Sequence, residues 1–132
     1  MDKIKNLWPD DLGNIKITMP KEILIQQGNY ISEMTKNLIV AEVKTDQGVL
    51  QGTDEKVMVH RFTLKAPTMG NYSFNLLRVM HNFSIYPVTV WNGLTESKTI
   101  ANNEDEFMAA IASIFSSNET RNAISSIIAQ SI

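Results

Sequence analysis

The chain has 132 residues, of which 43% are hydrophobic and 20% charged, and its formal net charge is −2. This composition is typical of a globular protein and excludes a disordered chain, so we expect a single domain over residues 1–132. The absence of cysteine excludes disulfides, thiolate metal sites and thiol catalysis. Lysine and arginine form no cluster, which leaves no electrostatic reason to expect nucleic acid as a partner.

The first residues of the chain lack the apolar stretch and the small-residue cleavage site of a signal peptide. No apolar run elsewhere has the length that a membrane span needs. We therefore expect a soluble cytoplasmic protein of bacterial type that has no membrane partner.

The first third of the chain predicts a short strand, a helix and a longer strand. Ile15 and Ile17 alternate with polar residues, as in a strand at the edge of a sheet. A helix is expected over residues 21–37, where apolar positions share one stripe after a proline that suits a first helical turn. From residue 39 the apolar period changes to two, which predicts a strand that ends at residues 46–48.

Residues 57–91 contain three β-rich runs joined by two short turns. If the first turn is tight, Leu64 lies opposite Phe74 and His60 lies opposite Arg78. Such cross-strand pairs are the unit that stabilises an antiparallel sheet. We therefore expect these runs to form the centre of a β-meander.

A second turn is expected at residues 81–82, because asparagine tolerates the backbone of tight hairpins. This turn would place Met80 beside Phe83. Pro87 lies in the third run and cannot donate a hydrogen bond to a neighbouring strand. The third run is therefore predicted to be an edge strand or to carry a bulge.

Two helices are expected after the sheet. Asn103 precedes Glu106 by three residues, which is the spacing of a capping box, and acidic residues between them suit a helix N-terminus. Ser116 and Glu119 repeat this spacing for a second helix. An N-terminal helix, an antiparallel meander of four or five strands and a C-terminal helical pair packed on it predict an α+β fold.

His60, Arg78 and Tyr72 form the first candidate site, for binding a small molecule. In the predicted register they share one region of the sheet, where arginine could attract an anion and histidine could act as acid or base. The alternative interpretation places these polar groups at the rim of the sheet, solvated or hydrogen-bonded.

Glu42 and Lys44 lie on one face of a predicted strand, where a carboxylate and an ammonium group could hold a metal ion and an attacking water. This spacing is similar to the second half of the PD-(D/E)xK nuclease motif. The resemblance covers these positions alone, and no partner aspartate is evident on a neighbouring strand. Alternating glutamate and lysine is also how solvent-facing strands avoid aggregation.

Apolar side chains occupy both predicted faces of the last two β-rich runs, although a half-solvated sheet alternates apolar with polar residues. Either helices cover both faces or one face meets a partner. The residues of this candidate interface are Leu77, Val79, Tyr86, Val88, Val90 and Trp91.

These patterns favour a non-enzymatic interaction module of the adaptor, chaperone-like or toxin-neutralising type. It would bind another protein or itself through the sheet, and the self-binding form would be a homo-oligomer. The alternatives are a small-molecule-binding or hydrolytic domain around His60 and Arg78, and a metal-dependent nuclease that uses Glu42 and Lys44. No catalytic residues, cofactor or dedicated metal site are expected, because two histidines without repeated carboxylate spacing make a poor ligand set.

Overall fold

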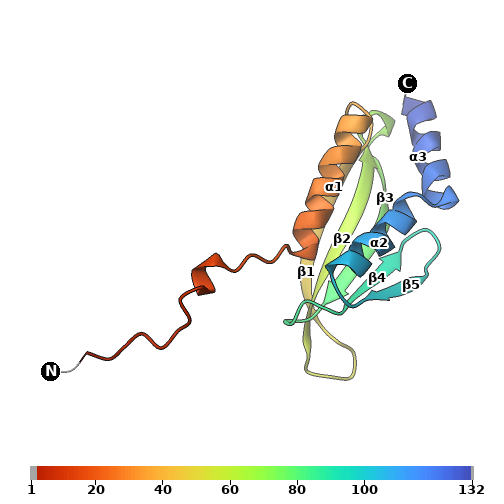
Figure 1. Cartoon of the computed structure of the whole chain (residues 1–132). Coiled ribbons are helices and arrows are strands. Elements are labelled where there is room, and N and C mark those ends of the chain that lie inside the picture. Colours follow the sequence, from red (N-terminus) through yellow and green to blue (C-terminus); the bar gives the residue numbers. More distant parts are fainter. Residues whose placement is uncertain (1–2, 132) are drawn as a thin grey trace.

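The computed structural model describes residues 3–131 and shows one helix, a five-stranded sheet and two further helices (Figure 1). The α+β fold predicted from the sequence is confirmed. The helices are α1 (Pro20–Met34), α2 (Glu104–Phe115) and α3 (Asn118–Ser131). The antiparallel strands lie in chain order and are β1 (Val40–Val49), β2 (Lys56–Ala66), β3 (Tyr72–His81), β4 (Val88–Asn92) and β5 (Lys98–Ala101).

Helix α1 begins where the sequence places a proline. Met19 is extended, with φ −76° and ψ 146°, which is the conformation that a residue before proline prefers. The helix ends before the predicted residue 37, because Lys36 and Asn37 adopt left-handed backbone angles that a helix cannot continue. Gly28 packs so closely on β1 that an added Cβ would lie 2.9 Å from the Cβ of Ala41.

The predicted cap of α2 is confirmed, and that of α3 is displaced by one residue. The backbone N–H of Glu106 donates to Asn103 Oδ1 at 2.8 Å. At α3 the N–H of Thr120 donates to Ser117 Oγ at 3.2 Å, so Ser117 is the capping residue. Ser116 instead donates its hydroxyl proton to the carbonyl of Ala112 at the end of α2.

A β-bulge changes the pairing of β2 with β3. The predicted register holds from Ala66 to Thr63 and then shifts by one residue at Phe62. Beyond this shift His60 lies opposite Val79, so the predicted pair of His60 with Arg78 is wrong. One extra residue on β3 is enough to reverse the face of every later side chain relative to its predicted partner.

The last two strands also differ from the prediction. Strand β3 ends at His81, but β4 begins only at Val88, so Met80 lies opposite Thr89 and not beside Phe83. Pro87 precedes β4, where its missing N–H removes no ladder bond. Strand β4 is interior because β5, which the sequence pattern did not predict, forms the edge.

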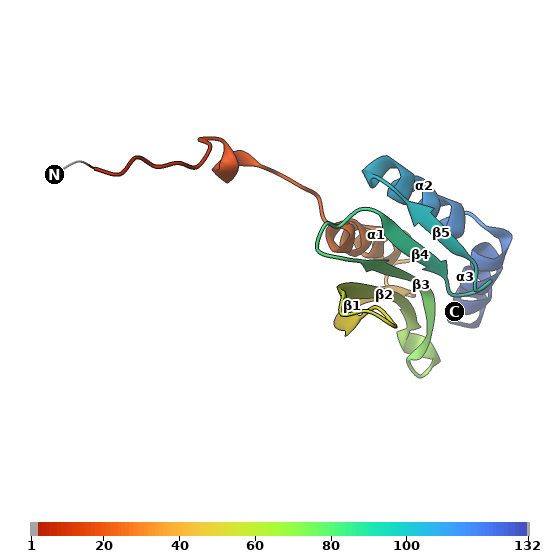
Figure 2. The same cartoon turned by 90° about the horizontal axis from the view of Figure 1, so that it is seen from below.

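All three helices lie on one face of the sheet, which we call the covered face (Figures 1 and 2). The core lies between the sheet and these helices and includes Leu24, Phe62, Leu64, Leu76, Leu77, Val79, Val88, Val90, Phe107, Ile111 and Ile127. The opposite face, which we call the open face, carries mainly polar side chains. They include Glu42, Lys44, Asp46, Arg61, Thr63, Lys65, Asn75, Arg78, Thr89 and Lys98.

Residues 3–19 form an N-terminal arm that runs away from the sheet and the helices (Figure 1). The arm is extended except for a short 3-10 turn, Leu12–Asn14, and every residue from 3 to 18 is exposed. The predicted edge strand at Ile15 and Ile17 is therefore absent from the described sheet. Across residues 3–131 no helix combines the length and the apolar character needed to cross a membrane.

Candidate functional site

The structure separates the three residues of the predicted small-molecule site. His60 is buried on the covered face, whereas Arg78 lies on the open face because of the bulge. Tyr72 stands at the beginning of β3 with 53% of its surface exposed, opposite Ala66. The expected convergence of these side chains does not occur, since the sheet itself lies between His60 and Arg78.

His60 instead takes part in a hydrogen-bonded chain with His81. The two Nε2 atoms are 2.8 Å apart, His60 Nδ1 is 2.9 Å from Thr45 Oγ1, and His81 Nδ1 is 2.9 Å from the carbonyl of Asn82. A carbonyl only accepts, so His81 Nδ1–H donates to Asn82. In the neutral pair His60 Nε2–H then donates to His81, and the Thr45 hydroxyl donates to His60. Every polar atom of the pair is satisfied, which is the pattern of a structural network.

Burial of His60, together with the nearby His81 and Lys21, lowers its pKa from 6.5 to about 4. The unfolded chain therefore binds more protons than the native protein between these values, and stability falls as the pH drops through this window. We expect the free energy of unfolding to decrease by about 2 kcal/mol between pH 7 and pH 4.5 from this group. Urea unfolding measured across this range tests it, with His60→Gln as comparison. An equal loss in that variant would contradict the assignment to His60.

Arg78 belongs to a cluster on the open face around Trp91. Its guanidinium carbon lies 5.0 Å from the centroid of the Trp91 ring, and Lys98 Nζ lies 5.4 Å from it. Cations within about 6 Å of an indole ring are attracted by its quadrupole. The two cations therefore share Trp91, beside a shallow cavity of about 470 Å³ that Asn75 and Glu96 also line.

The candidate interface is mostly part of the core. Leu77, Val79, Val88 and Val90 are at most 1% exposed and face the helices, so a partner could not reach them without displacing those helices. The prediction that they form a surface is therefore corrected, because the bulge turns Leu77 and Val79 to the covered face. Among the six residues of the candidate interface, only Trp91 lies on the open face.

Tyr86 is half-buried in the loop before β4 and packs against the core. Its hydroxyl is buried and has no hydrogen-bond partner within the described residues. Burial, with a contribution from Glu104, raises the pKa of this phenol. Tyr86 therefore remains neutral and contributes packing on the covered side of the molecule.

Glu42 and Lys44 form an ion pair on the open face, with Glu42 Oε1 3.1 Å from Lys44 Nζ. A second ion pair joins Glu42 to Lys65 on β2. Hydrogen bonds from Lys65 and Lys44 lower the pKa of the Glu42 carboxyl. Residues 3–131 contain no group of three histidine, aspartate or glutamate side chains placed to hold a metal ion. The neighbours of Glu42 are cations, so this geometry is that of a charged strand surface.

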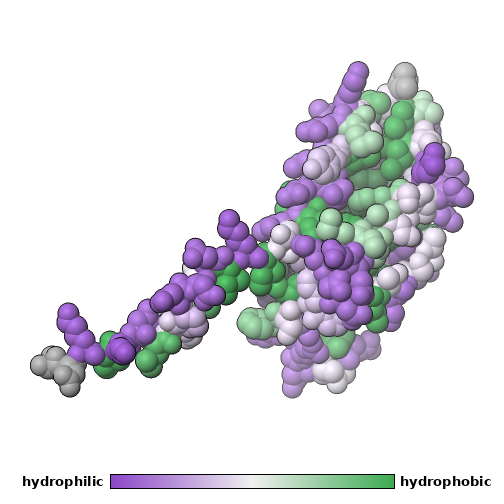
Figure 3. Space-filling model, in the orientation of Figure 1, coloured by the Kyte–Doolittle hydropathy of each residue, from purple (hydrophilic) through white to green (hydrophobic). Residues whose placement is uncertain are grey.

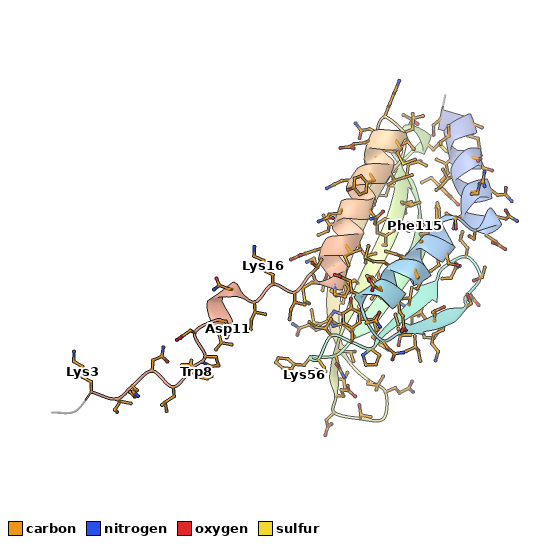
Figure 4. The ribbon with its side chains drawn as sticks, in the orientation of Figure 1. Lys3, Trp8, Asp11, Lys16, Lys56 and Phe115 are labelled. Carbon is orange, nitrogen blue, oxygen red and sulfur yellow. The ribbon has the colours of Figure 1, made fainter. Side chains whose placement is uncertain are left out.

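The N-terminal arm exposes six large apolar side chains, and hydrophobic atoms interrupt its polar surface in Figure 3. Trp8 is 74% exposed and lies far from the sheet and the helices (Figure 4). The other five are Ile4, Leu7, Leu12, Ile15 and Ile17, which are between 45% and 93% exposed. Apolar residues in this density usually mark a surface that binds another macromolecule.

An apolar groove of about 330 Å³ lies between α1 and α3, and we call it the helix groove. Its floor is formed by Phe62 and Leu64 of the sheet and its end by Phe115, which Figure 4 labels at the end of α2. Hydrophobic atoms are visible in the space between α1 and α3 in Figure 3. At its rim Tyr30 is 55% and Met34 is 80% exposed. The groove forms because α1 and α3 stand apart, although Phe62 and Leu64 beneath it are at most 2% exposed.

Both features were missed in the sequence. The sequence pattern predicts an edge strand in this segment, because Ile15 and Ile17 alternate with polar residues. One available signal was the density of apolar residues in a segment that Pro9 and Gly13 interrupt. The groove has no sequence signal of its own, since it depends on the spacing between two helices.

Comparisons with protein-family models, with curated proteins and with solved structures found no match to this chain.

Proposed function

We propose that this protein is a non-enzymatic protein-interaction module and that the N-terminal arm is its principal binding element. The observation that carries the proposal is the row of six exposed apolar side chains on the arm. Full burial of a large apolar side chain stabilises a complex by about 1.5–3 kcal/mol before entropic costs. Such a segment is therefore a strong candidate for binding a complementary apolar surface.

The sheet supports this function less well than the sequence led us to expect. Four residues of the candidate interface are buried, and charged side chains on the open face are engaged with one another. A small-molecule or hydrolytic function also has less support, because His60 and Arg78 lie on opposite faces of the sheet. The arm is where apolar surface is concentrated and accessible.

Photo-crosslinking in living cells tests the proposal. We expect p-benzoylphenylalanine at position 7, beside Trp8, to give discrete covalent protein adducts, since Leu7 is 86% exposed on the arm. The same crosslinker at Gln51, an exposed turn residue between β1 and β2, is the matched control. Adducts are detected as discrete species of higher mass on denaturing gels and identified by mass spectrometry.

Adducts at position 7 that are missing at position 51 support the interaction module, whether the captured protein is another copy or a different chain. Equal labelling at the two positions would show that the arm meets only random neighbours. That result would overturn the proposal.

A further inference from the structure

We infer that the helix groove of one copy of this protein binds the N-terminal arm of a second copy, with Trp8 as the anchor. This inference rests on the proposed function and names its partner. It follows from three properties of the described residues: the chemistry of the groove, the position of one unpaired cation, and the direction of the arm.

The groove and the arm match in their apolar character. The groove has a volume of about 330 Å³, and the partly buried Ile31, Phe115 and Ile124 line it above the buried Phe62 and Leu64. Trp8 and Leu7 are adjacent and exposed on the arm. Tryptophan in a well-packed apolar pocket is a common energetic centre of protein interfaces.

Charge complementarity fixes the orientation of the arm. Arg121 of α3 is the charged residue in the lining of the groove, and it takes part in no ion pair within residues 3–131. Asp10 and Asp11 lie two and three residues after Trp8 on the arm. They also take part in no ion pair within residues 3–131. With Trp8 in the groove, these carboxylates come within reach of Arg121, where a bidentate ion pair can form.

The direction of the arm favours a second copy over the same chain. Residues 15–19 lead away from the sheet and the helices, so Trp8 lies far from the groove of its own chain (Figures 1 and 4). In the described conformation the arm is therefore presented to another molecule.

The symmetry of a reciprocal exchange of arms also suits a defined complex. In such an exchange the two copies use the same pair of surfaces, so the interface is isologous. Both arms and both grooves are then occupied, and a third copy cannot be added.

Sedimentation of the full chain over about two decades of concentration around the micromolar range tests the inference. We expect a reversible dimer, and we expect Trp8→Ser to raise its Kd by at least about thirtyfold, as loss of an interface anchor does. Met34→Asp places a charge on the exposed rim of the groove and should weaken the dimer similarly. The matched control is Phe83→Ser, which removes a fully exposed apolar side chain outside the arm and the groove and should leave the Kd unchanged.

A charge exchange separates direct pairing from general surface effects. Arg121→Glu and the double change Asp10→Lys with Asp11→Lys should each weaken the dimer at least about tenfold, and combining them should restore most of the affinity. In mixtures of isotope-labelled and unlabelled copies, crosslinks from position 7 should join the arm of one copy to α1 or α3 of the other. Failure of the combined variant to recover affinity would overturn the orientation and with it the assigned site.

The outcomes also separate this inference from the proposed function. The protein could be monomeric at every concentration while its arm still captures a different protein in cells. That outcome would overturn the second copy as the partner, but it would support the proposed interaction module. A dimer insensitive to Trp8→Ser and Met34→Asp would overturn the assigned site. A monomer whose arm captures nothing would overturn both.

Discussion

Replacement of Phe107 by alanine is expected to lower the free energy of unfolding by about 3–5 kcal/mol. Phe107 is completely buried in the first turn of α2, which packs on β4 and β5. Its ring belongs to the main core, so the truncation removes apolar contact on all sides and leaves a cavity that the sheet cannot collapse to fill. Urea unfolding followed by far-UV circular dichroism measures the loss, and the thermal midpoint should fall by about 10 °C or more.

The matched control is Met108→Ala, one residue further along the same helix. Met108 is 45% exposed, so its truncation should cost no more than about 1 kcal/mol. Helix propensity changes little in either variant compared with the cost of the cavity, since alanine is the best helix former. A similar loss in the two variants would mean that α2 is not anchored on the sheet through Phe107.

Replacement of Gly93 by alanine is expected to lower the free energy of unfolding by about 3 kcal/mol, although it adds a single methyl group. Gly93 directly follows β4, and its N–H donates to the carbonyl of Leu76 at 2.7 Å. A Cβ at this position would lie 2.1 Å from the carbonyl oxygen of Asn75. That oxygen belongs to the backbone of β3, so the clash can be relieved only by separating the two segments. Chemical denaturation of the purified variant measures the effect.

Gly48→Ala is the control for this experiment. An added Cβ at Gly48 meets only Val57 Cγ2, at an ordinary contact distance of 3.9 Å. Alanine there also reduces the conformational entropy of the unfolded chain, so the variant should be neutral or slightly more stable. If Gly93→Ala were as stable as Gly48→Ala, the close contact between the segment after β4 and the bulged part of β3 would be wrong.

Gly93 also explains why the strand register could not be predicted. The bulge inserts Leu76 into β3, and both Leu76 and Leu77 are then buried. The carbonyl of Leu76 is satisfied by Gly93, a residue far along the chain that can approach closely because it has no side chain. Alternation of residues within β3 carries no information about this contact, so the sequence predicted an uninterrupted hairpin.

The candidate sites depend on the same one-residue shift. The hairpin register predicted correctly up to Thr63 would have continued to pair His60 with Arg78 on one face. After the shift His60 joins His81 in the buried layer and Arg78 joins Trp91 on the open face. Leu77 and Val79, which the sequence pattern places on a second exposed face, are for the same reason residues of the core.

Features that depend on neighbouring residues could be predicted from the amino-acid sequence. The capping box at Asn103, the helix that starts at Pro20 and the apolar period of the strands act over a few residues, so they indicated an α+β fold with a β-meander. Only the folded structure shows which face each strand residue occupies and where a groove opens between the helices. Those features depend on contacts between segments far apart in the chain, at the bulge of β3 and between α1 and α3.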